Sequence, residues 1–455
     1  MVQAMGQAES STGKFKKHDQ QQQQEQLIPG LPDEIAMDCL VRVPHQFHST
    51  MNLVCRGWRR LIMHPSFYQE RSRSGMAEHM VFLIQPVPCL SPTQTEFSES
   101  NNREDEVDAK ISSPLLTQYG LSIYNATNQT WRRMMMRQPG GGYVGIPMFC
   151  QCVALPASGK LLLLGGWDPN TLEPVPDVYV LDLIGGSRWR RAAPMSVARS
   201  FFACGIVGQS TVYVAGGHDN LKNALRSAEV YDADADKWRT LPPMAEERDE
   251  CQGLSWEGDS RFWVVSGYST DSQGRFRSDA ECYDPVTGSW SRIDGAWPYS
   301  SVSPRGLTAN VTITNDNNTS GHQYQWWWIL GSQQQPQDNV RVKETDNCNN
   351  LIWKVVNSVQ LPSEINGTTS GLCVINALGL TQDQCFMNSR NRQRQGIFFM
   401  SRGGAGGRGT SSSSLICGEC KREGEGASIL TTKWNHICTP PAFAVLPHSA
   451  SCLVI

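Results

Sequence analysis

The chain has 455 residues, of which 39% are hydrophobic and 18% are charged, and its formal net charge at pH 7 is −3. A charge so close to neutral gives no general attraction to nucleic acid or to acidic membrane surfaces, so neither is expected as a partner. No apolar run approaches the roughly eighteen residues that a membrane-spanning helix requires.

Residues 1–26 are polar and Gln-rich, and we expect them to form a disordered tail. This segment has no apolar core of the kind that a secretory signal carries, so the cytoplasm or the nucleus is the expected location. In such a reducing compartment the 15 cysteines are expected to be free thiols, many of them buried in strands.

Residues 27–73 are expected to form a small domain of three helices. The first helix begins at Pro32, where the following acidic residues complement the positive end of the helix dipole, and Pro44 ends it. A second apolar helix is predicted over residues 49–62 and a short third one over residues 65–73. Because so short a segment buries little core, a partner surface is expected to cover part of it.

Two separated motifs in this segment resemble the F-box, namely Leu31-Pro32-Asp33-Glu34 and Val54-Cys55-Arg56-Gly57-Trp58. The resemblance covers Ile28 to roughly Arg71. It implies docking onto the Skp-type adaptor of a ubiquitin ligase and, through it, onto a cullin scaffold. The adaptor-facing ridge is expected to consist of Leu31, Pro32, Ile35, Leu40, Val43 and Pro44. Val54, Cys55 and Trp58 are expected to continue this ridge or to hold the helices together. A generic amphipathic cap on the rest of the chain is the alternative.

A pattern of about fifty residues recurs four times in the middle of the chain. An apolar strand ends in a pair of small residues, an aromatic or aliphatic residue with Asp follows, and Trp comes next. In the best copy, strands are predicted over 201–207, 211–215 and 228–231, and a fourth opens at Trp238. Such a repeat indicates a propeller of four-stranded antiparallel blades, in which the Trp side chains fill the wedge between neighbouring blades.

The order of Gly-Gly, Tyr-Asp, Trp, Pro-Met and Arg resembles the kelch repeat. The resemblance implies an all-β kelch propeller, for which we count six blades over residues 78–455. Val81 to Ile84, Gly120 to Tyr124 and Trp131 supply three strands of the first blade. Its missing strand is expected from the C-terminal Ser449 to Ile455, which would close the ring and remove an open sheet edge.

Polar segments in the propeller are expected to form insertion loops, because they contain too few apolar residues to order themselves. These segments are 88–114, 314–325, 332–350, 380–395 and 402–426. In the last one, Cys417 and Cys420 have the spacing of a zinc knuckle, but His436 and Cys438 complete the four ligands only irregularly. Two unrelated thiols are the preferred interpretation, so no metal or other cofactor is expected.

An F-box followed by kelch repeats resembles a plant family of substrate receptors of SCF-type (Skp–cullin–F-box) ubiquitin ligases. The resemblance implies a non-catalytic subunit that holds a target protein for ubiquitination and degradation by the proteasome. In such families the target is an enzyme of phenylpropanoid synthesis or a hormone-response regulator. A kelch scaffold without a link to ubiquitination is the alternative. A kelch-based copper oxidase would need a compact set of Tyr, Cys and His ligands, which the sequence does not show.

In other kelch receptors, the Arg that opens each blade lines the channel mouth and captures acidic motifs. The matching positions here are Arg199, Arg248 and Arg305, although no complete ring of Arg is present. Salt bridges between blades, to Asp249, Glu250 or Asp219, are an equally open role for them. The residues after the glycine pairs are expected on the same binding rim. The candidate substrate-binding residues are therefore Arg199, Arg248, Asp249, Arg305, Trp167, His218 and Tyr268.

Overall fold

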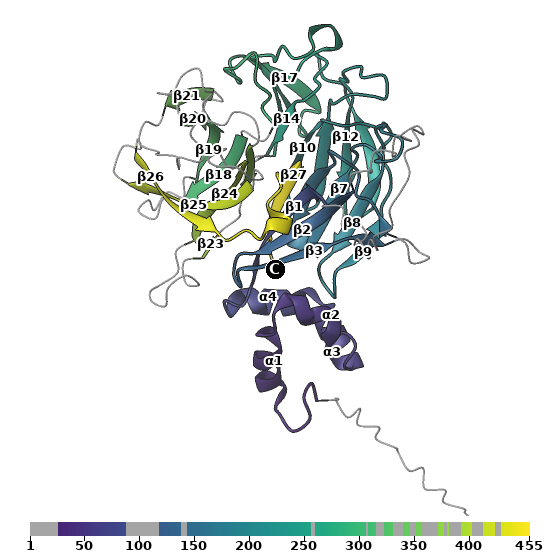
Figure 1. Cartoon of the computed structure of the whole chain (residues 1–455), viewed down its shortest axis with the longest axis vertical. Helices are drawn as coiled ribbons and strands as arrows, with labels where there is room; N and C mark the ends of the chain where they lie inside the picture. The colour runs from purple at the N-terminus through teal and green to yellow at the C-terminus, as the bar shows by residue number, and fades with distance from the viewer. Residues whose placement is uncertain are drawn as a thin grey trace, which may run out of the picture.

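The computed structural model describes residues 26–87, 118–137, 143–255, 260–305, 308–314, 323–330, 340–345, 351–355, 372–376, 380–381, 393–402, 413–423 and 429–455. Beyond residue 305, side chains are described at 398, 400, 415–417 and 434–455. A helical unit lies at one end of the molecule, and antiparallel sheets fan out from it (Figure 1). Residues 1–25 of the tail predicted over 1–26, and the loop predicted over 88–114, lie outside the described residues.

The helical unit is built from four short α-helices and one 3-10 turn. They are α1 (Asp33–Val41), η1 (His45–Phe47), α2 (His48–Met51), α3 (Arg56–Ile62) and α4 (Pro65–Arg73). The helix predicted over 49–62 is therefore wrong as a single element. Cys55 is extended, and its Sγ accepts a hydrogen bond from the backbone N–H of Trp58, so it starts a new helix after a turn.

In the described residues, six sheets have four antiparallel strands in their main path, numbered here as blades 1 to 6. Blade 1 contains β27 (Ser449–Val454), β1 (His79–Pro86), β2 (Tyr119–Asn125) and β3 (Thr130–Met134). Blade 2 contains β6 (Gln151–Leu155), β7 (Lys160–Leu164), β8 (Val178–Asp182) and β9 (Arg188–Arg191). Blade 3 contains β10 (Ala203–Val207), β11 (Thr211–Ala215), β12 (Ala228–Asp232) and β13 (Lys237–Leu241). The four strands of blade 3 agree closely with those predicted for the best repeat.

Three further blades follow along the chain. Blade 4 contains β14 (Gln252–Leu254), β15 (Phe262–Val265), β16 (Ala280–Asp284) and β17 (Ser289–Ile293). Blade 5 contains β18 (Thr308–Thr314), β19 (Gln323–Leu330), β20 (Val340–Thr345) and β21 (Leu351–Val355). Blade 6 contains β22 (Leu372–Asn376), β24 (Gln393–Arg402), β25 (Ser413–Glu423) and β26 (Ile429–Ile437), with β23 (Leu380–Thr381) paired to β24. A two-stranded pair, β4 (Met136–Arg137) and β5 (Tyr143–Val144), lies between blades 1 and 2 in the sequence.

Strands occupy parts of the segments that the sequence predicts to be loops. β20 lies within 332–350 and β25 within 402–426, while β19 and β24 begin inside two other such segments. β20 and β25 each pair with a strand on both sides. Backbone hydrogen bonds to two neighbours hold a polar strand in place, which composition alone does not reveal. Cys417 of the suggested zinc knuckle is buried among apolar residues of blades 6 and 1.

The C-terminal strand completes blade 1, as predicted. β27 pairs antiparallel with β1, with Val81 opposite Cys452. Apolar clusters join blades 1 and 6, blades 2 and 3, and blades 3 and 4. The sheets therefore fit the blades of a kelch propeller, whereas a closed ring of six remains a prediction.

The Trp of the last strand ties a blade to the preceding one. The Trp238 indole N–H donates to the Ala193 carbonyl at 2.8 Å, and that of Trp290 donates to Pro242 at 2.7 Å. Trp131 donates in the same way to Cys438, which follows the last strand of blade 6, at 3.1 Å. The predicted packing role of these Trp residues thus includes a recurring hydrogen bond between blades.

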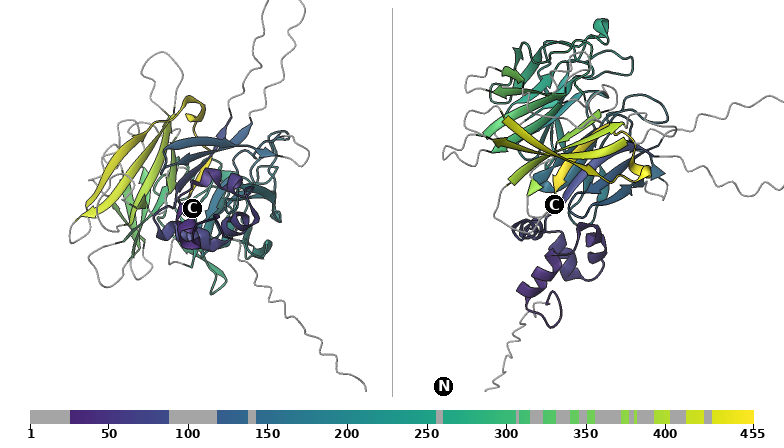
Figure 2. Two further views of the ribbon diagram at one scale, coloured as in Figure 1. Left: turned by 90° about the horizontal axis from the view of Figure 1, so that it is seen from below. Right: turned by 60° about the vertical axis from the view of Figure 1, so that its left-hand side comes forward.

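The helical unit packs against blades 1 and 2, at the end of the strands where β8 turns into β9 (Figure 2). His45 Nε2 lies 2.8 Å from the Leu183 carbonyl, and the Gly185 backbone N–H donates to the Tyr68 hydroxyl. An apolar cluster continues from Leu40 of α1 into these blades. The helical unit does not cover the opposite ends of the blade strands, which are therefore left for other contacts.

No helix in the described part of the chain is long and apolar enough to cross a membrane.

Candidate functional site

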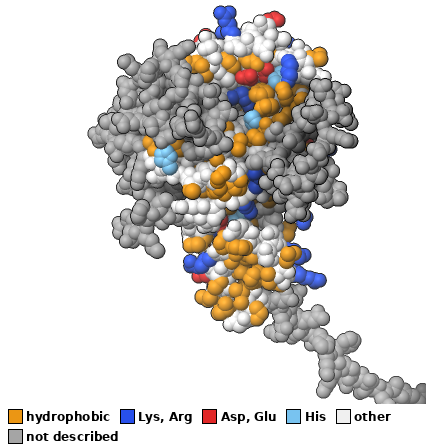
Figure 3. All heavy atoms as spheres, in the orientation of Figure 1, with side chains coloured by type: hydrophobic (Ala, Val, Ile, Leu, Met, Phe, Trp, Pro, Cys, Tyr) orange, Lys and Arg blue, Asp and Glu red, His pale blue; other side chains and the backbone are white. Residues whose placement is uncertain are grey.

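A surface of exposed apolar side chains covers the helical unit. Large hydrophobic side chains that are about half exposed or more are concentrated there: Ile35 (50%), Phe47 (49%), Leu53 (77%), Val54 (59%) and Met63 (60%). Figure 3 shows hydrophobic side chains gathered on the helices below the sheets. Exposed apolar patches of this kind mark sites where another protein binds. We call these five residues the helical apolar surface.

The residues predicted to face the adaptor fall into three groups in the structure. Pro32, Ile35, Val54 and Cys55 are exposed, and Leu31, Val43, Pro44 and Trp58 are half-buried. The Trp58 indole N–H donates to the Leu27 carbonyl at 2.6 Å, so this side chain also holds the helices together. Leu40 is only 2% exposed and lies in the core, so its assignment to the adaptor-facing ridge is wrong. Helical spacing places it beside exposed residues, and packing against the propeller buries it.

Met63, Phe47 and Leu53 belong to the helical apolar surface but were not predicted. Met63 directly follows α3, whereas Phe47 and Leu53 lie earlier in the chain. Both are large apolar residues in an otherwise polar stretch between the two F-box motifs. Their position in the turns around the short helix α2 explains why helical periodicity did not identify them.

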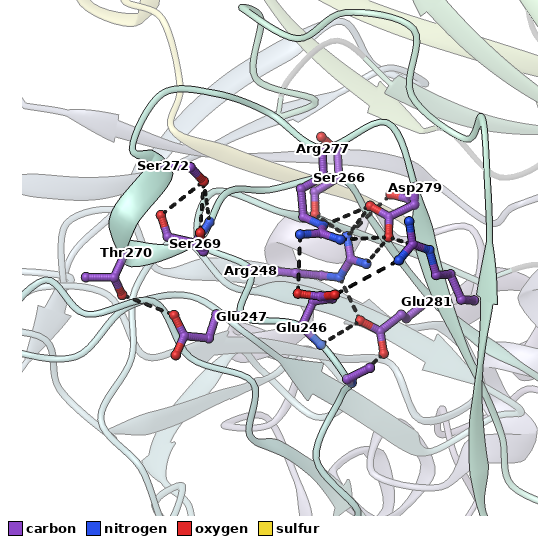
Figure 4. A network of polar contacts seen from close by, with 12 residues as sticks. Glu246, Glu247, Arg248, Ser266, Ser269, Thr270, Ser272, Arg277, Asp279 and Glu281 are labelled. Carbon is purple, nitrogen blue, oxygen red and sulfur yellow. Dashed lines mark hydrogen bonds and ion pairs between the residues drawn. The ribbon is translucent and has the colours of Figure 1, made fainter.

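Arg199 and Arg248 are completely buried, in equivalent positions of blades 3 and 4. Arg199 pairs with Glu229 of β12 at 2.9 Å, and Arg248 pairs with Glu281 of β16 and with Asp279, both at 3.0 Å (Figure 4). The carboxylate partners of each Arg belong to the same blade as that Arg, which lies just before the blade's first strand.

The prediction that these two Arg side chains line the channel mouth and bind acidic motifs is therefore wrong. The alternative, a structural ion pair, describes them, but the partners lie within one blade and are not Asp249, Glu250 or Asp219. Blade 2 has Pro147 at the position of Arg and Tyr179 at the position of Glu229, so both members of the pair are missing together.

Trp167, His218 and Tyr268 follow the small-residue pairs of blades 2, 3 and 4, as the sequence indicates. Each forms an isolated β-bridge with the residue three positions before the blade's first strand: Met148, Ser200 and Asp249. The bridges set the side chains in a row across three neighbouring blades. Gly217 permits this turn, because its φ is +82° and an added Cβ would lie 2.3 Å from the Ser200 carbonyl oxygen.

Polar contacts connect this row of side chains. Both carboxylate oxygens of Asp249 lie 3.0 Å from His218 Nδ1, and the Trp167 indole N–H donates to His218 Nε2 at 3.3 Å. The ring N–H of His218 is therefore assigned to Nδ1, where it donates to Asp249. The Tyr268 hydroxyl donates to Glu250 at 3.3 Å, and burial raises the pKa of this phenol. The structure thus brings together four of the predicted substrate-binding residues.

Aromatic rings fill the space beside this row. Phe201 stacks on His218 at 5.5 Å and contacts Phe149 at 4.9 Å, and Phe149 contacts His448. Burial, and secondarily the nearby Arg305, lower the pKa of His448 to about 4, so the ring is neutral at physiological pH. We call Trp167, His218, Asp249, Phe149 and Phe201 the aromatic cluster.

The backbone of this region is unusual at equivalent positions of three blades. Phe149, Phe201 and Glu250 have φ values of 58°, 54° and 50°, in the left-handed region that non-glycine residues seldom adopt. Such strain persists where surrounding structure enforces it, and it is concentrated at functional sites. Phe149 and Phe201 were not predicted as site residues, although an aromatic residue just before the first strand of two successive repeats was a usable signal.

Arg305 is the third predicted Arg, and its environment differs from that of the other two. Its guanidinium lies over the Phe201 ring at 5.4 Å and donates to the carbonyls of Phe202 and Cys251. No carboxylate lies within ion-pair distance of it among the described residues. Arg305 is thus a half-buried cation that lies beside the aromatic cluster.

The aromatic cluster lies at the ends of the blade strands opposite the helical unit. β7 leads from Gly159, which contacts the β8–β9 turn beside the helices, to Gly165 and then Trp167 at the other end. The described residues thus carry an apolar surface on the helices and an aromatic, polar cluster at the opposite ends of the blade strands, in a protein of the class that joins a small helical unit to β-blades.

Comparison with known proteins agrees with this class. The Kelch motif model matches residues 198–245, which cover blade 3. The chain is 42% identical to F-box/kelch-repeat protein SKIP20 of Arabidopsis thaliana, over 94% of this chain and 97% of that protein. It is 52% identical to F-box/kelch-repeat protein At2g44130 of the same plant, over 65% of this chain and 71% of that protein. The chain belongs to the F-box/kelch-repeat protein family. Its N-terminal helices are accordingly the F-box region, and its sheets are kelch blades.

Proposed function

We propose that the chain is the non-catalytic substrate receptor of an SCF-type ubiquitin ligase. In this proposal the F-box region binds a Skp-type adaptor and, through it, a cullin scaffold. The propeller holds a target protein for ubiquitination and proteasomal degradation, in the cytoplasm, the nucleus or both. The F-box/kelch-repeat names of its relatives support the proposal.

The observation that carries the proposal is the helical apolar surface. The helical unit already packs its core residues against the propeller, yet Leu53, Val54 and Met63 remain 59 to 77% exposed. Further packing within the chain therefore does not account for them. Burying apolar area stabilises a complex by roughly 25 cal/mol per Å², so an adaptor surface that covered them would gain several kcal/mol.

The propeller's part in the proposal is to position the target. We propose six blades in a closed ring, which the Trp131 bond to blade 6 supports because it repeats the link between consecutive blades. The aromatic cluster then faces away from the adaptor, and a bound target is tethered near the conjugating enzyme. Tethering replaces a bimolecular encounter by an intramolecular one with a high effective concentration.

The target class follows only from the family resemblance, and we propose an enzyme of phenylpropanoid synthesis or a response regulator. The test compares proteins captured in plant cells by the wild-type chain and by Val54→Glu, whose propeller is intact. We expect one or a few proteins to accumulate on the variant, to be ubiquitinated with the wild type, and to be released from both by Trp167→Ala. A target that binds both forms equally and is never ubiquitinated would favour a kelch scaffold instead.

A further inference from the structure

The surroundings of the aromatic cluster favour a positive ligand. Residues 246–250 carry four carboxylates around Arg248, whose own charge is fully used within its blade. Glu246 is paired with Arg277 and Arg292, so the carboxylates of Asp249 and Glu250 are the ones that remain near the aromatic cluster. Asp249 is 5% exposed, and its described neighbours are the His218 ring and the backbone N–H of Glu250. The Tyr268 hydroxyl also bonds to Asp249, and the His218 ring lies between this carboxylate and the Trp167 indole. An indole face with a buried negative charge behind it is an environment in which a cation is stabilised.

One cation of the chain itself, the Lys222 ammonium, already lies beside the aromatic cluster. The Lys222 ammonium lies 3.3 Å from the centroid of the Trp167 ring and 3.4 Å from His218 Nε2. Burial lowers the pKa of Lys222, and the negative charge of Asp249 acts in the opposite direction. The ammonium thus contacts the Trp167 ring and His218 directly, and the charge of Asp249 acts on it from beyond ion-pair distance.

The attachment of Lys222 is weak compared with that of the other cation in the region. Arg305 is fixed over Phe201 by two carbonyl acceptors. Lys222 has no carboxylate within ion-pair distance in the described chain, and its φ of 64° places it in a strained backbone conformation at an exposed loop tip. The equivalent turn of blade 2 has the same conformation at Leu172, so the turn itself sets this φ, and releasing the Lys222 side chain would free the Trp167 face without a change of backbone.

We infer that Trp167, His218 and Asp249 form a subsite for a basic side chain of the target, a guanidinium or ammonium group. In the free chain, the Lys222 ammonium occupies this subsite in place of the target's basic group. The inference rests on the proposed function, since it names the chemistry of the segment that the propeller binds. It also reverses the expectation of an acidic motif, because Arg199 and Arg248 are neutralised in their own blades.

The test uses the full chain in complex with a Skp-type adaptor and three small probes. These are Nα-acetyl-arginine amide, its neutral isostere Nα-acetyl-citrulline amide, and Nα-acetyl-glutamate amide. Ligand-observed NMR measures their affinities, and the indole N–H resonance that disappears in Trp167→Phe locates the binding. We expect Lys222→Met to bind the arginine probe about three- to tenfold more tightly than the wild type, in line with the usual strength of a cation–π contact.

Three controls accompany this measurement. Lys237→Met, at an exposed position on the outer strand of blade 3, should leave the affinity unchanged. Lys222→Met combined with Trp167→Leu or with Asp249→Asn should lose the gain. Binding of the citrulline probe should not respond to Lys222→Met.

A Lys222→Met variant that binds the arginine probe no more tightly than the wild type would overturn the inference. So would a preference for the glutamate probe that Lys222→Met abolishes, because Lys222 would then be an anchor for acidic groups. Whether the chain co-elutes with the adaptor is measured on the same preparations. Failure of the subsite with adaptor binding intact removes this inference alone, and loss of adaptor binding from the wild type removes the proposed function.

Discussion

The guanidinium of Arg71 donates to the carboxylate of Glu78 at 2.8 Å, and both side chains are buried. Arg71 lies in α4, and Glu78 immediately precedes β1. The same guanidinium donates to the Val43 carbonyl, and the Glu78 carboxylate accepts the backbone N–H of His45. This buried network joins the F-box region to blade 1.

The first prediction concerns this junction. Glu78→Ala should lower the free energy of unfolding by about 3 to 5 kcal/mol, because it leaves the Arg71 charge buried without a carboxylate. Glu70→Ala is the control, since the Glu70–Arg73 pair is exposed and worth at most about 1 kcal/mol. Urea unfolding measures both variants. Similar small losses would show that the junction network does not hold the two parts together.

The second prediction concerns the hydrogen bonds between blades. Trp238 and Trp189 occupy equivalent positions and are both half-buried, but only the Trp238 indole N–H has an acceptor in the described structure. Trp238→Phe should therefore cost about 1 kcal/mol more stability than Trp189→Phe, the usual net worth of a hydrogen bond. Urea midpoints of the two variants measure the difference. Equal midpoints would count against a stabilising role of this bond.

The third prediction concerns the ion pair inside blade 3. Arg199→Met should destabilise the chain by about 3 to 5 kcal/mol, because Glu229 is then buried and uncompensated. The double variant Arg199→Met, Glu229→Met should recover most of this loss, since no charge is left unpaired. Thermal unfolding of the set provides the test. A stable Arg199→Met variant that fails to bind the target would instead restore a direct binding role for Arg199.

The fourth prediction concerns pH. Burial lowers the pKa of His45 to about 4 and that of His48 to about 3, whereas unfolded imidazoles titrate near pH 6.5. Between these values the unfolded chain binds protons that the folded chain does not. Stability is therefore complete above pH 6.5 and is lost as the pH falls, by up to about 1.4 kcal/mol per pH unit for each ring.

His48→Phe should reduce this dependence. The variant retains an aromatic ring against Phe67 and Tyr68 but removes one protonation site. Free energies of unfolding measured from pH 6 to pH 5 should fall less steeply for the variant than for the wild type, and the two curves should run parallel from pH 7 to pH 8. Parallel curves over the whole range would contradict burial of a neutral His48.

The sequence predicted the regular part of the fold well, because the determinants are local. The period from Gly216-Gly217 to Trp238 predicts one blade almost residue by residue, and the apolar C-terminus predicts the partner of β1. β20 and β25 were missed because pairing on both sides, rather than composition, makes them strands.

The candidate sites were less predictable, because they depend on contacts between distant residues. Trp167, His218 and Asp249 lie in contact in the structure, and their place on a binding rim stays a prediction. The roles of Arg199 and Arg248 depend on Glu229 and Glu281, which lie about thirty residues further along the chain and carry no motif of their own. The position of Lys222 over Trp167 likewise has no sequence signal.

The affinity of the purified chain for a Skp-type adaptor, measured with Val54→Glu and Val286→Glu beside the wild type, tests the central claim most directly. Val54 is 59% exposed in the helical apolar surface, and Val286 is 85% exposed on the turn between β16 and β17. Neither change should alter the unfolding midpoint. We predict a complex with the wild type and with Val286→Glu, and at least about a tenfold weaker one with Val54→Glu, because a charge would be buried at the contact. A wild-type chain that binds no adaptor, or a Val54→Glu variant that binds as tightly as Val286→Glu, would contradict the account.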